Sequence, residues 1–252
     1  MVTYFSKKAS ITGAFLIYGF LFWQASATAT ETVRVRQVVD GDSLRLVDGR
    51  KVRLIGINTP ELARDGKPDE PLAVRARDAL KKIVAGRALT LKLGPDKKDR
   101  YGRTLAYVIL PDGSFAGEKL LQTGLASMIA VPPNIEHLQF YQQAEASARR
   151  QRIGIWAHPW FRPVAAESLD NTRTGYRFVA GQINRVGKSR KYYYFDLTRD
   201  FSIAIKRNHW HHFGGNPDRW RGRKIVVRGW ISRSRDKLRM RIDHPAMIEV
   251  IN

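Results

Sequence analysis

The chain has 252 residues, no cysteine and a formal net charge of +21. The absence of cysteine excludes a disulfide-stabilised scaffold, so the fold must be stabilised by a buried core and by ligands. The charge is uneven: residues 28–170 carry a net charge of +6, whereas residues 171–252 carry +13. A field this positive attracts polyanions, so nucleic acid and anionic membranes are the leading partner classes; a basic surface without a specific partner is the alternative.

The N-terminus has the three-part layout of a secretory signal peptide. Lys7 and Lys8 precede a mostly apolar run from Ile11 to Trp23, and small residues follow at Ala25-Ser26-Ala27. We therefore predict a signal peptide at residues 1–27 and a secreted or periplasmic protein. An uncleaved membrane anchor is the alternative, although the apolar run is shorter than the roughly 20 residues that span a bilayer.

Residues 28–162 read as a first domain that is rich in strands. Alternating and apolar runs predict strands at 32–39, 43–47, 51–57, 88–93 and 103–110. Helical spacing predicts three helices: one from the Asp69 cap to Gly86, one at 118–123 and one at 136–152. Strands first and helices later indicate a small barrel with helices packed against it, an α+β arrangement.

A tight hairpin brings charged residues together in this domain. Asp48-Gly49 is a strong hairpin signal between the second and third strands. If the strands pair symmetrically about this turn, Asp42 faces the neighbourhood of Ile55, and Asn58 and Glu61 end just beyond Asp42. Arg53 lies among apolar neighbours on the returning strand and needs an anionic partner, because an unpaired buried charge is expensive.

Residues 163–175 lack periodicity and are predicted to be a linker to a second, basic domain at 176–252. That domain is predicted to hold strands at 176–186, 191–198, 201–205, 224–232, 238–242 and 248–251, with one helix within 206–223. A helix between the third and fourth of five or six strands is typical of a small OB-like β-barrel, although sandwich folds share this spacing.

The hairpin residues suit phosphodiester hydrolysis. That reaction needs cations preorganised for the developing negative charge, a group that activates water and, usually, a metal. Arginine donates two hydrogen bonds to phosphate oxygens, and carboxylates with a backbone carbonyl suit Ca²⁺. Asp42, Arg53, Thr59 and Glu61 supply these groups, but a second arginine is still required.

Three ordered motifs resemble those of the staphylococcal nuclease (thermonuclease) family. They are Asp40-Gly41-Asp42-Ser43, then Arg53 followed by Thr59-Pro60-Glu61, then Asp99-Arg100-Tyr101-Gly102-Arg103. With the runs at 122–126 and 154–157, the resemblance covers residues 33–158. It implies a five-stranded OB-fold barrel with three helices. It also implies a Ca²⁺-dependent nuclease that cuts the 5′ P–O bond of DNA and RNA and leaves 3′-phosphate ends.

The resemblance also implies roles for individual residues. Glu61 corresponds to the residue that activates or orients the attacking water, and Arg53 and Arg103 would hold the scissile phosphate. Arg100 and Tyr101 match residues that contact a terminal phosphate or the nearby backbone.

The implied metal site contains a departure from the family pattern. Asp42 would be a direct Ca²⁺ ligand and Thr59 would supply its carbonyl, but Asn58 stands where the family has a second aspartate. Because Ca²⁺ affinity follows ligand charge, we expect weaker binding or the use of another divalent ion. A second departure is Ala130-Val131-Pro132, which replaces a region where the type member stacks tyrosines on the nucleotide.

Two clusters stand out in the second domain. His209-Trp210-His211-His212 could bind a metal, although an aromatic and basic surface explains it at least as well. The run from Tyr192 to Phe195 alternates between faces, so half of it should be core and half could stack on bases.

The sequence predicts an exported nuclease whose second domain adds nucleic-acid contacts. A catalytically impaired nucleic-acid-binding or envelope-associated protein is the alternative, and Asn58 is the residue that favours it.

Overall fold

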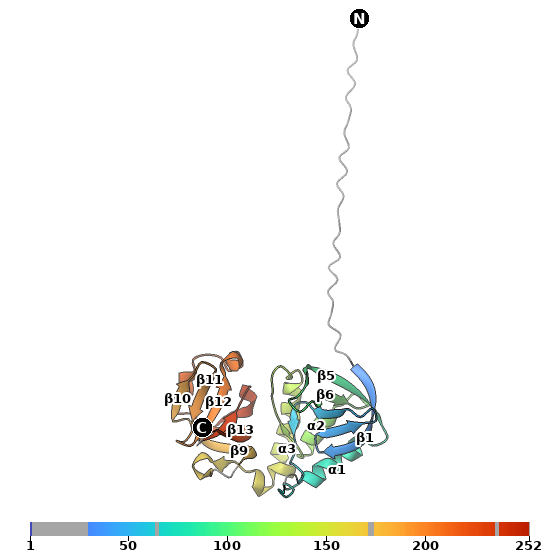
Figure 1. Ribbon diagram of the computed structural model, residues 1–252, viewed down its shortest axis with the longest axis horizontal. Helices are drawn as coiled ribbons and strands as arrows, with labels where there is room; N and C mark the ends of the chain where they lie inside the picture. Colours follow the sequence, from blue (N-terminus) through green and yellow to red (C-terminus); the bar gives the residue numbers. More distant parts are fainter. Residues whose placement is uncertain (2–29, 64–65, 171–173, 235–236, 252) are drawn as a thin grey trace.

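The structure is a computed structural model that describes Met1 and residues 30–63, 66–170, 174–234 and 237–251 (Figure 1). The predicted signal peptide falls on residues 1–27 and, apart from Met1, lies outside these ranges. Within the described ranges, no helix has both the length and the apolar character that a membrane crossing requires.

The first domain is built on a closed barrel of five strands, as predicted. Its order is β1-β2-β3-β6-β5, and β3 and β6 run parallel whereas the other neighbours are antiparallel. The strands are β1 (Thr30–Asp40), β2 (Ser43–Leu46), β3 (Lys51–Leu54), β5 (Ala88–Lys98) and β6 (Thr104–Ile109). Side chains such as Leu44, Val52 and Leu91 are fully buried and fill the barrel.

Three helices and a two-stranded ribbon complete this domain, again as predicted for the helix number. They are α1 (Ala73–Val84), α2 (Ala116–Gln122) and α3 (Leu138–Gln151), with the ribbon β4 (Ile57–Asn58) and β7 (Ser127–Met128). The predicted start of α1 at the Asp69 cap is wrong. Asp69 accepts a hydrogen bond from the Ala63 amide at 2.6 Å, and the helix begins only after Leu72, which has a φ of 70°.

The second domain is a sheet in the order β10-β11-β12-β14-β13-β9-β8, with β15 on β13. Its strands are β8 (Val164–Ala165), β9 (Gly175–Gln182), β10 (Arg185–Lys188), β11 (Tyr192–Asp196), β12 (Phe201–Lys206), β13 (Lys224–Ser234), β14 (Lys237–Arg241) and β15 (Ile248–Ile251). The predicted linker therefore contributes a strand, because β8 pairs with β9. Short 3₁₀ helices η1 (Gly154–Trp156), η2 (Pro159–Phe161) and η3 (Ala166–Ser168) lead into this sheet.

The strand order of the second domain repeats that of the first barrel. β9 and β10 are separated by only Ile183 and Asn184, and they occupy opposite ends of the run from β10 to β9. β12 and β14 are parallel, as β3 and β6 are in the first domain. The sheet must therefore curl round on itself, which is the OB-like arrangement predicted for this part of the chain.

Two details of the second domain differ from prediction. The strand expected at 176–186 is interrupted at Ile183-Asn184, where pairing passes from β13 to β11. The single helix expected within 206–223 is two 3₁₀ helices, η4 (Arg207–His212) and η5 (Pro217–Trp220); a further 3₁₀ helix, η6 (Pro245–Met247), precedes β15. Gly214 and Gly215 both have positive φ, and this stops a continuous helix.

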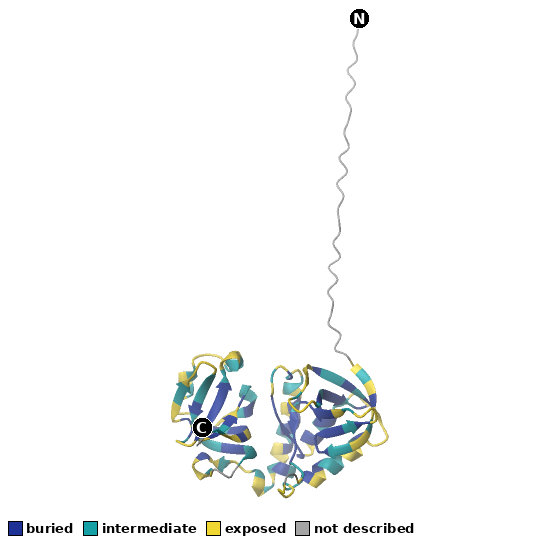
Figure 2. Cartoon of the chain, viewed as in Figure 1, coloured by how far each residue is buried: buried dark blue, intermediate teal, exposed yellow. Residues whose placement is uncertain are grey.

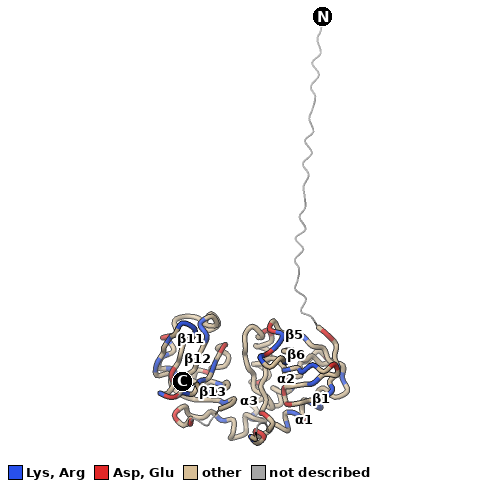
Figure 3. Tube along the Cα trace, viewed as in Figure 1, with Lys and Arg blue, Asp and Glu red and all other residues tan. Residues whose placement is uncertain are grey.

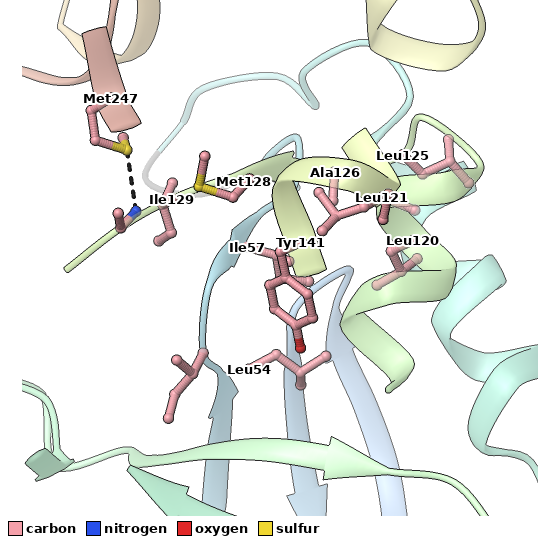
Figure 4. Packing of buried hydrophobic residues seen from close by; sticks show 14 of the residues in the cluster. Leu54, Ile57, Leu120, Leu121, Leu125, Ala126, Met128, Ile129, Tyr141 and Met247 are labelled. Atoms are coloured by element: carbon pink, nitrogen blue, oxygen red, sulfur yellow. Dashed lines mark hydrogen bonds between the residues drawn. The ribbon is translucent and has the colours of Figure 1, made fainter. Parts of the chain in front are cut away.

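Both domains have buried interiors (Figure 2), and side-chain contacts join the two. At their contact, the Met247 thioether accepts a hydrogen bond from the Ala130 amide at 3.2 Å, beside the buried Ile129 and Met128 (Figure 4). The Arg228 guanidinium lies 2.7 Å from the Glu145 carboxylate, and both side chains are at least nine-tenths buried. The second domain is thus fixed to the first by buried contacts.

Candidate active site

The hairpin between β2 and β3 sets the register of the site. Ser43 pairs with Arg53, so Asp42 lies opposite Leu54, whose amide donates to the Asp42 carbonyl at 2.9 Å. Asp42 thus faces the neighbourhood of Ile55, as predicted, but its pairing partner is one residue earlier than symmetric pairing about the turn gives. The cause is a three-residue loop with Gly49 at a φ of 88°, instead of a symmetric two-residue turn.

Arg53 has the anionic partner that its burial requires. Its Nη1 lies 2.6 Å from Oδ2 of Asp42, and the two residues are only 7% and 3% exposed. Its Nη2 donates to Oδ1 of Asn58 at 3.2 Å. A guanidinium held by two oxygen acceptors has a fixed orientation, as a preorganised phosphate-binding group needs.

Thr59 closes the cluster around Asp42. Its amide and its hydroxyl donate to Oδ2 of Asp42 at 3.1 and 3.2 Å. This approach depends on Gly41, because a Cβ there would lie 2.6 Å from the Thr59 hydroxyl oxygen. The structure thus explains the glycine between the two aspartates of the motif, and it joins four predicted site residues, Asp42, Arg53, Asn58 and Thr59, into one bonded cluster.

Arg103 reaches the same cluster through a residue that the sequence reasoning did not assign. Its Nη1 lies 3.4 Å from the Ser43 hydroxyl, which donates to Oδ1 of Asp42 at 3.0 Å. Its Nε donates to Asp99 at 2.7 Å. Burial alone would raise the pKa of Asp99, but hydrogen bonds from Arg103 outweigh it and hold that pKa below its usual value. Asp99 therefore remains a charged anchor for Arg103.

Tyr101 and Arg100 lie beside Arg103 at the surface. Tyr101 is 68% exposed, and the guanidinium carbons of Arg100 and Arg103 lie 4.7 and 5.6 Å from its ring centre. This stacked group is accessible to a phosphate or sugar of a bound strand.

Glu61 is half-buried, and its backbone is held by a second residue that the sequence reasoning did not assign. Its amide donates to Oε2 of Glu70 at 3.0 Å, and its carbonyl accepts from the Glu70 amide at 2.9 Å. Oε1 of Glu70 in turn lies 3.0 Å from Nη1 of Arg177 in β9. In the sequence, Glu70 stands only at the predicted start of a helix, and no local pattern there predicts its contacts with Glu61 and Arg177.

The oxygen atoms of Asp42, Asn58 and Thr59 are ligands of the type that a hard divalent cation prefers. They comprise carboxylate, amide and carbonyl oxygens. Asp42 supplies the only carboxylate of the three, and in the described part of the chain no three His, Cys, Asp or Glu side chains cluster in a way that could hold a metal. The charge available to an ion from this set is therefore low.

The histidine cluster of the second domain has an acidic partner. Nδ1 of His209 lies 2.9 Å from Asp243, which is far away in sequence. The His212 ring contacts those of His211 and His244, with ring centres 3.9 and 5.1 Å apart. Burial lowers the pKa of His212 and of His244, so the neutral rings are favoured.

Comparison with known proteins matches residues 51–158 to the family model described as "Staphylococcal nuclease homologue". The chain is 37% identical over 129 residues to a thermonuclease of Staphylococcus intermedius, and the aligned region covers 50% of this chain and 76% of the relative. It is 35% identical over 131 residues to the thermonuclease of Staphylococcus hyicus, with 51% and 77% covered. It is also 32% identical over 130 residues to "Endonuclease YncB" of Bacillus subtilis (strain 168), with 50% and 61% covered.

Proposed function

We propose that this chain, which belongs to the staphylococcal nuclease family, hydrolyses phosphodiester bonds of DNA and RNA and leaves 3′-phosphate ends. The observation that supports this best is the cluster in which Asp42 holds Arg53 directly and reaches Arg103 through Ser43. Two guanidinium groups, from Arg53 on β3 and from Arg103 just before the neighbouring β6, are thereby brought to one cluster, as binding of a phosphodiester requires.

Each group then has a role in the reaction. Glu61 takes a proton from water, or orients it, as the water oxygen attacks phosphorus. Arg53 and Arg103 donate hydrogen bonds to the equatorial oxygens, whose negative charge grows in the transition state. The 5′ oxygen leaves with the bonding electron pair and gains a proton, and the phosphate stays on the 3′ oxygen.

Asp42, Asn58 and the Thr59 carbonyl would hold a divalent cation, with Ca²⁺ as the proposed ion. When bound, such an ion adds positive charge at the phosphate and makes a coordinated water more acidic.

Digestion of single-stranded DNA and of RNA tests the proposal. We expect both to be cut in Ca²⁺ and neither to be cut in a chelator, and end analysis should find 3′-phosphates. Parallel reactions in Mg²⁺ and Mn²⁺ identify the preferred ion. No cleavage of either substrate with any of these ions would overturn the enzyme proposal.

A single substitution addresses the metal directly. Asn58→Asp adds a second carboxylate to the donor set, so the half-saturating Ca²⁺ concentration should fall by about tenfold. Asn216→Asp is the matched control, because it adds the same charge at an exposed position in the second domain. Equal metal dependence in all three proteins would remove Asn58 from the proposed metal site.

The alternative is a nucleic-acid-binding protein without activity. It is favoured by the neutral Asn58 and by Asp42, whose Oδ2 already accepts from Thr59 and pairs with Arg53. Strand binding without cleavage in any divalent ion would establish this alternative.

We also propose that residues 1–27 direct export and are then removed. Sequencing the N-terminus of the protein recovered from the medium or periplasm tests this. A mature protein that starts near residue 28 supports it, whereas an intact N-terminus in the membrane fraction favours the anchor.

The second domain supplies a surface suited to a nucleic-acid strand. Tyr192 and Tyr194 stand on β11 with ring centres 6.0 Å apart, and the Arg239 guanidinium on β14 lies 5.2 Å from the Tyr194 ring. Their neighbour Phe195 is buried, as the alternation predicts. Figure 3 shows further basic segments around β11 and β12. Aromatic rings with nearby guanidinium groups are the means by which proteins hold unpaired bases and phosphates.

Loss of this surface should weaken binding without affecting chemistry. The Glu61→Gln background is used so that the oligonucleotide is not cut. In this background, Tyr194→Ala should weaken binding to a single-stranded oligonucleotide by about 1–3 kcal/mol. Arg239→Ala should lower the slope of log affinity against log salt concentration by the amount that corresponds to about one phosphate contact. Arg219→Ala, exposed in η5, is the control. If the Tyr194 and Arg239 variants bind like the control, this surface does not hold the strand.

A further inference from the structure

The second domain touches the segment that carries the site residues, at three neighbouring positions of its sheet. Tyr176 and Arg177 are consecutive on β9, and Arg228 lies opposite Phe178 on the paired strand β13. Each of the three bonds a different residue of the first domain, and each of those residues contacts the backbone of β4, of β7 or of Glu61.

The Arg177 contact leads to Glu61. Nη1 of Arg177 lies 3.0 Å from Glu70, and both side chains are only 19% exposed. The other carboxylate oxygen of Glu70 accepts from the Glu61 amide at 3.0 Å, and the Glu70 amide donates to the Glu61 carbonyl. Both backbone polar groups of Glu61 are therefore held by one residue, whose own side chain is oriented from the second domain.

The other two contacts lead to the ribbon that carries Asn58. The Ser127 hydroxyl donates to the Tyr176 hydroxyl at 3.0 Å, and Ser127 pairs with Asn58 across β4 and β7. Burial raises the pKa of Tyr176 to about 12, so its hydroxyl stays protonated. Glu145, paired with Arg228, accepts from the Met128 amide at 2.7 Å in the same ribbon.

From these contacts we infer that Arg177 and Glu70 are positioning residues for Glu61, so that the second domain completes the active site. The inference rests on the proposed function, because it assumes that Glu61 acts on the attacking water. A partly buried ion pair orients a carboxylate more strictly than solvent does, and small displacements of a catalytic group are costly.

Steady-state kinetics of the full chain test the inference. Arg177→Met should lower kcat by roughly tenfold to a hundredfold and leave KM within about twofold. Arg177→Lys, which keeps the charge, should recover part of the loss. Because both changes act through Glu70, Arg177→Met combined with Glu70→Ala should be no slower than Glu70→Ala alone.

Arg149→Met provides the matched control. Arg149 pairs with Glu249 at 2.8 Å across the same domain boundary, but the pair is about half exposed, and the Arg149 guanidinium lies 5.1 Å from the Trp156 ring centre. It should leave kcat unchanged. An equal loss in the Arg149 and Arg177 variants would show that domain attachment, not Glu61 placement, controls the rate, and an unchanged kcat in Arg177→Met would overturn the inference. A wild-type protein without any activity would instead defeat the proposed function.

Discussion

Glu61→Gln should lower kcat by a factor on the order of 10² to 10⁴, with KM little changed. The amide is nearly the same size as the carboxylate, but it cannot accept a proton from water. The two hydrogen bonds between Glu70 and Glu61 involve the Glu61 backbone amide and carbonyl, and the substitution leaves these groups intact. The loss should therefore come from chemistry, and single-turnover cleavage of a labelled oligonucleotide measures it.

Two checks separate this loss from misfolding. Glu167→Gln, at an exposed position in η3, makes the same chemical change away from the site and should retain full activity. Thermal unfolding of Glu61→Gln should match that of the wild type. Full activity in Glu61→Gln would mean that another group activates the water, and the assigned role would be lost.

Arg228→Met should destabilise the protein by about 3 to 5 kcal/mol, the cost of leaving a buried partner charge unpaired. Glu145 is 3% exposed, and its carboxylate also holds the Met128 amide. Burial would lower the pKa of Arg228, but the Glu145 carboxylate outweighs it and raises that pKa above its ordinary value. The pair is therefore charged, and denaturant unfolding of the variant should show a lower midpoint.

A second substitution tests the cause of that loss. Arg228→Met combined with Glu145→Gln removes the unpaired negative charge of Glu145 but keeps a side-chain oxygen that accepts from the Met128 amide. Much of the lost stability should therefore return. Breaking the exposed Arg149–Glu249 pair should cost less than about 1 kcal/mol. If the double variant is no more stable than Arg228→Met, charge burial is not the source of the effect. These tests use point substitutions because deletion of the second domain would expose the whole interface between the domains.

The barrel of the first domain can be predicted from the sequence, because the signals for its strands and turns are local. Alternation in β2, the Asp48-Gly49 turn and the glycines after the helices each act within a few residues. The pairing of Arg53 with an acid could also be predicted, because a buried guanidinium requires one.

The sequence did not indicate contacts that depend on the assembled fold. The observed hairpin register differs from the predicted one by one residue, because the length of the loop and not the turn dipeptide sets the pairing. The helix α1 starts later than predicted, because the carboxylate of Asp69 accepts a hydrogen bond from the Ala63 amide instead of capping the helix. Arg177 and Glu70 are 107 positions apart, and no periodicity links them.

The buried pair of Arg228 and Glu145 also bears on how such chains can evolve. A descendant that lost the second domain would lose Arg228, but the same loss would open the interface to water, so Glu145 would become a solvated carboxylate. Its hydrogen bond from the Met128 amide lies within the first domain, so we expect relatives that end after the nuclease barrel to tolerate a carboxylate at this position. The need for a buried cation would then arise with the second domain itself, which supplies both the cover over Glu145 and Arg228.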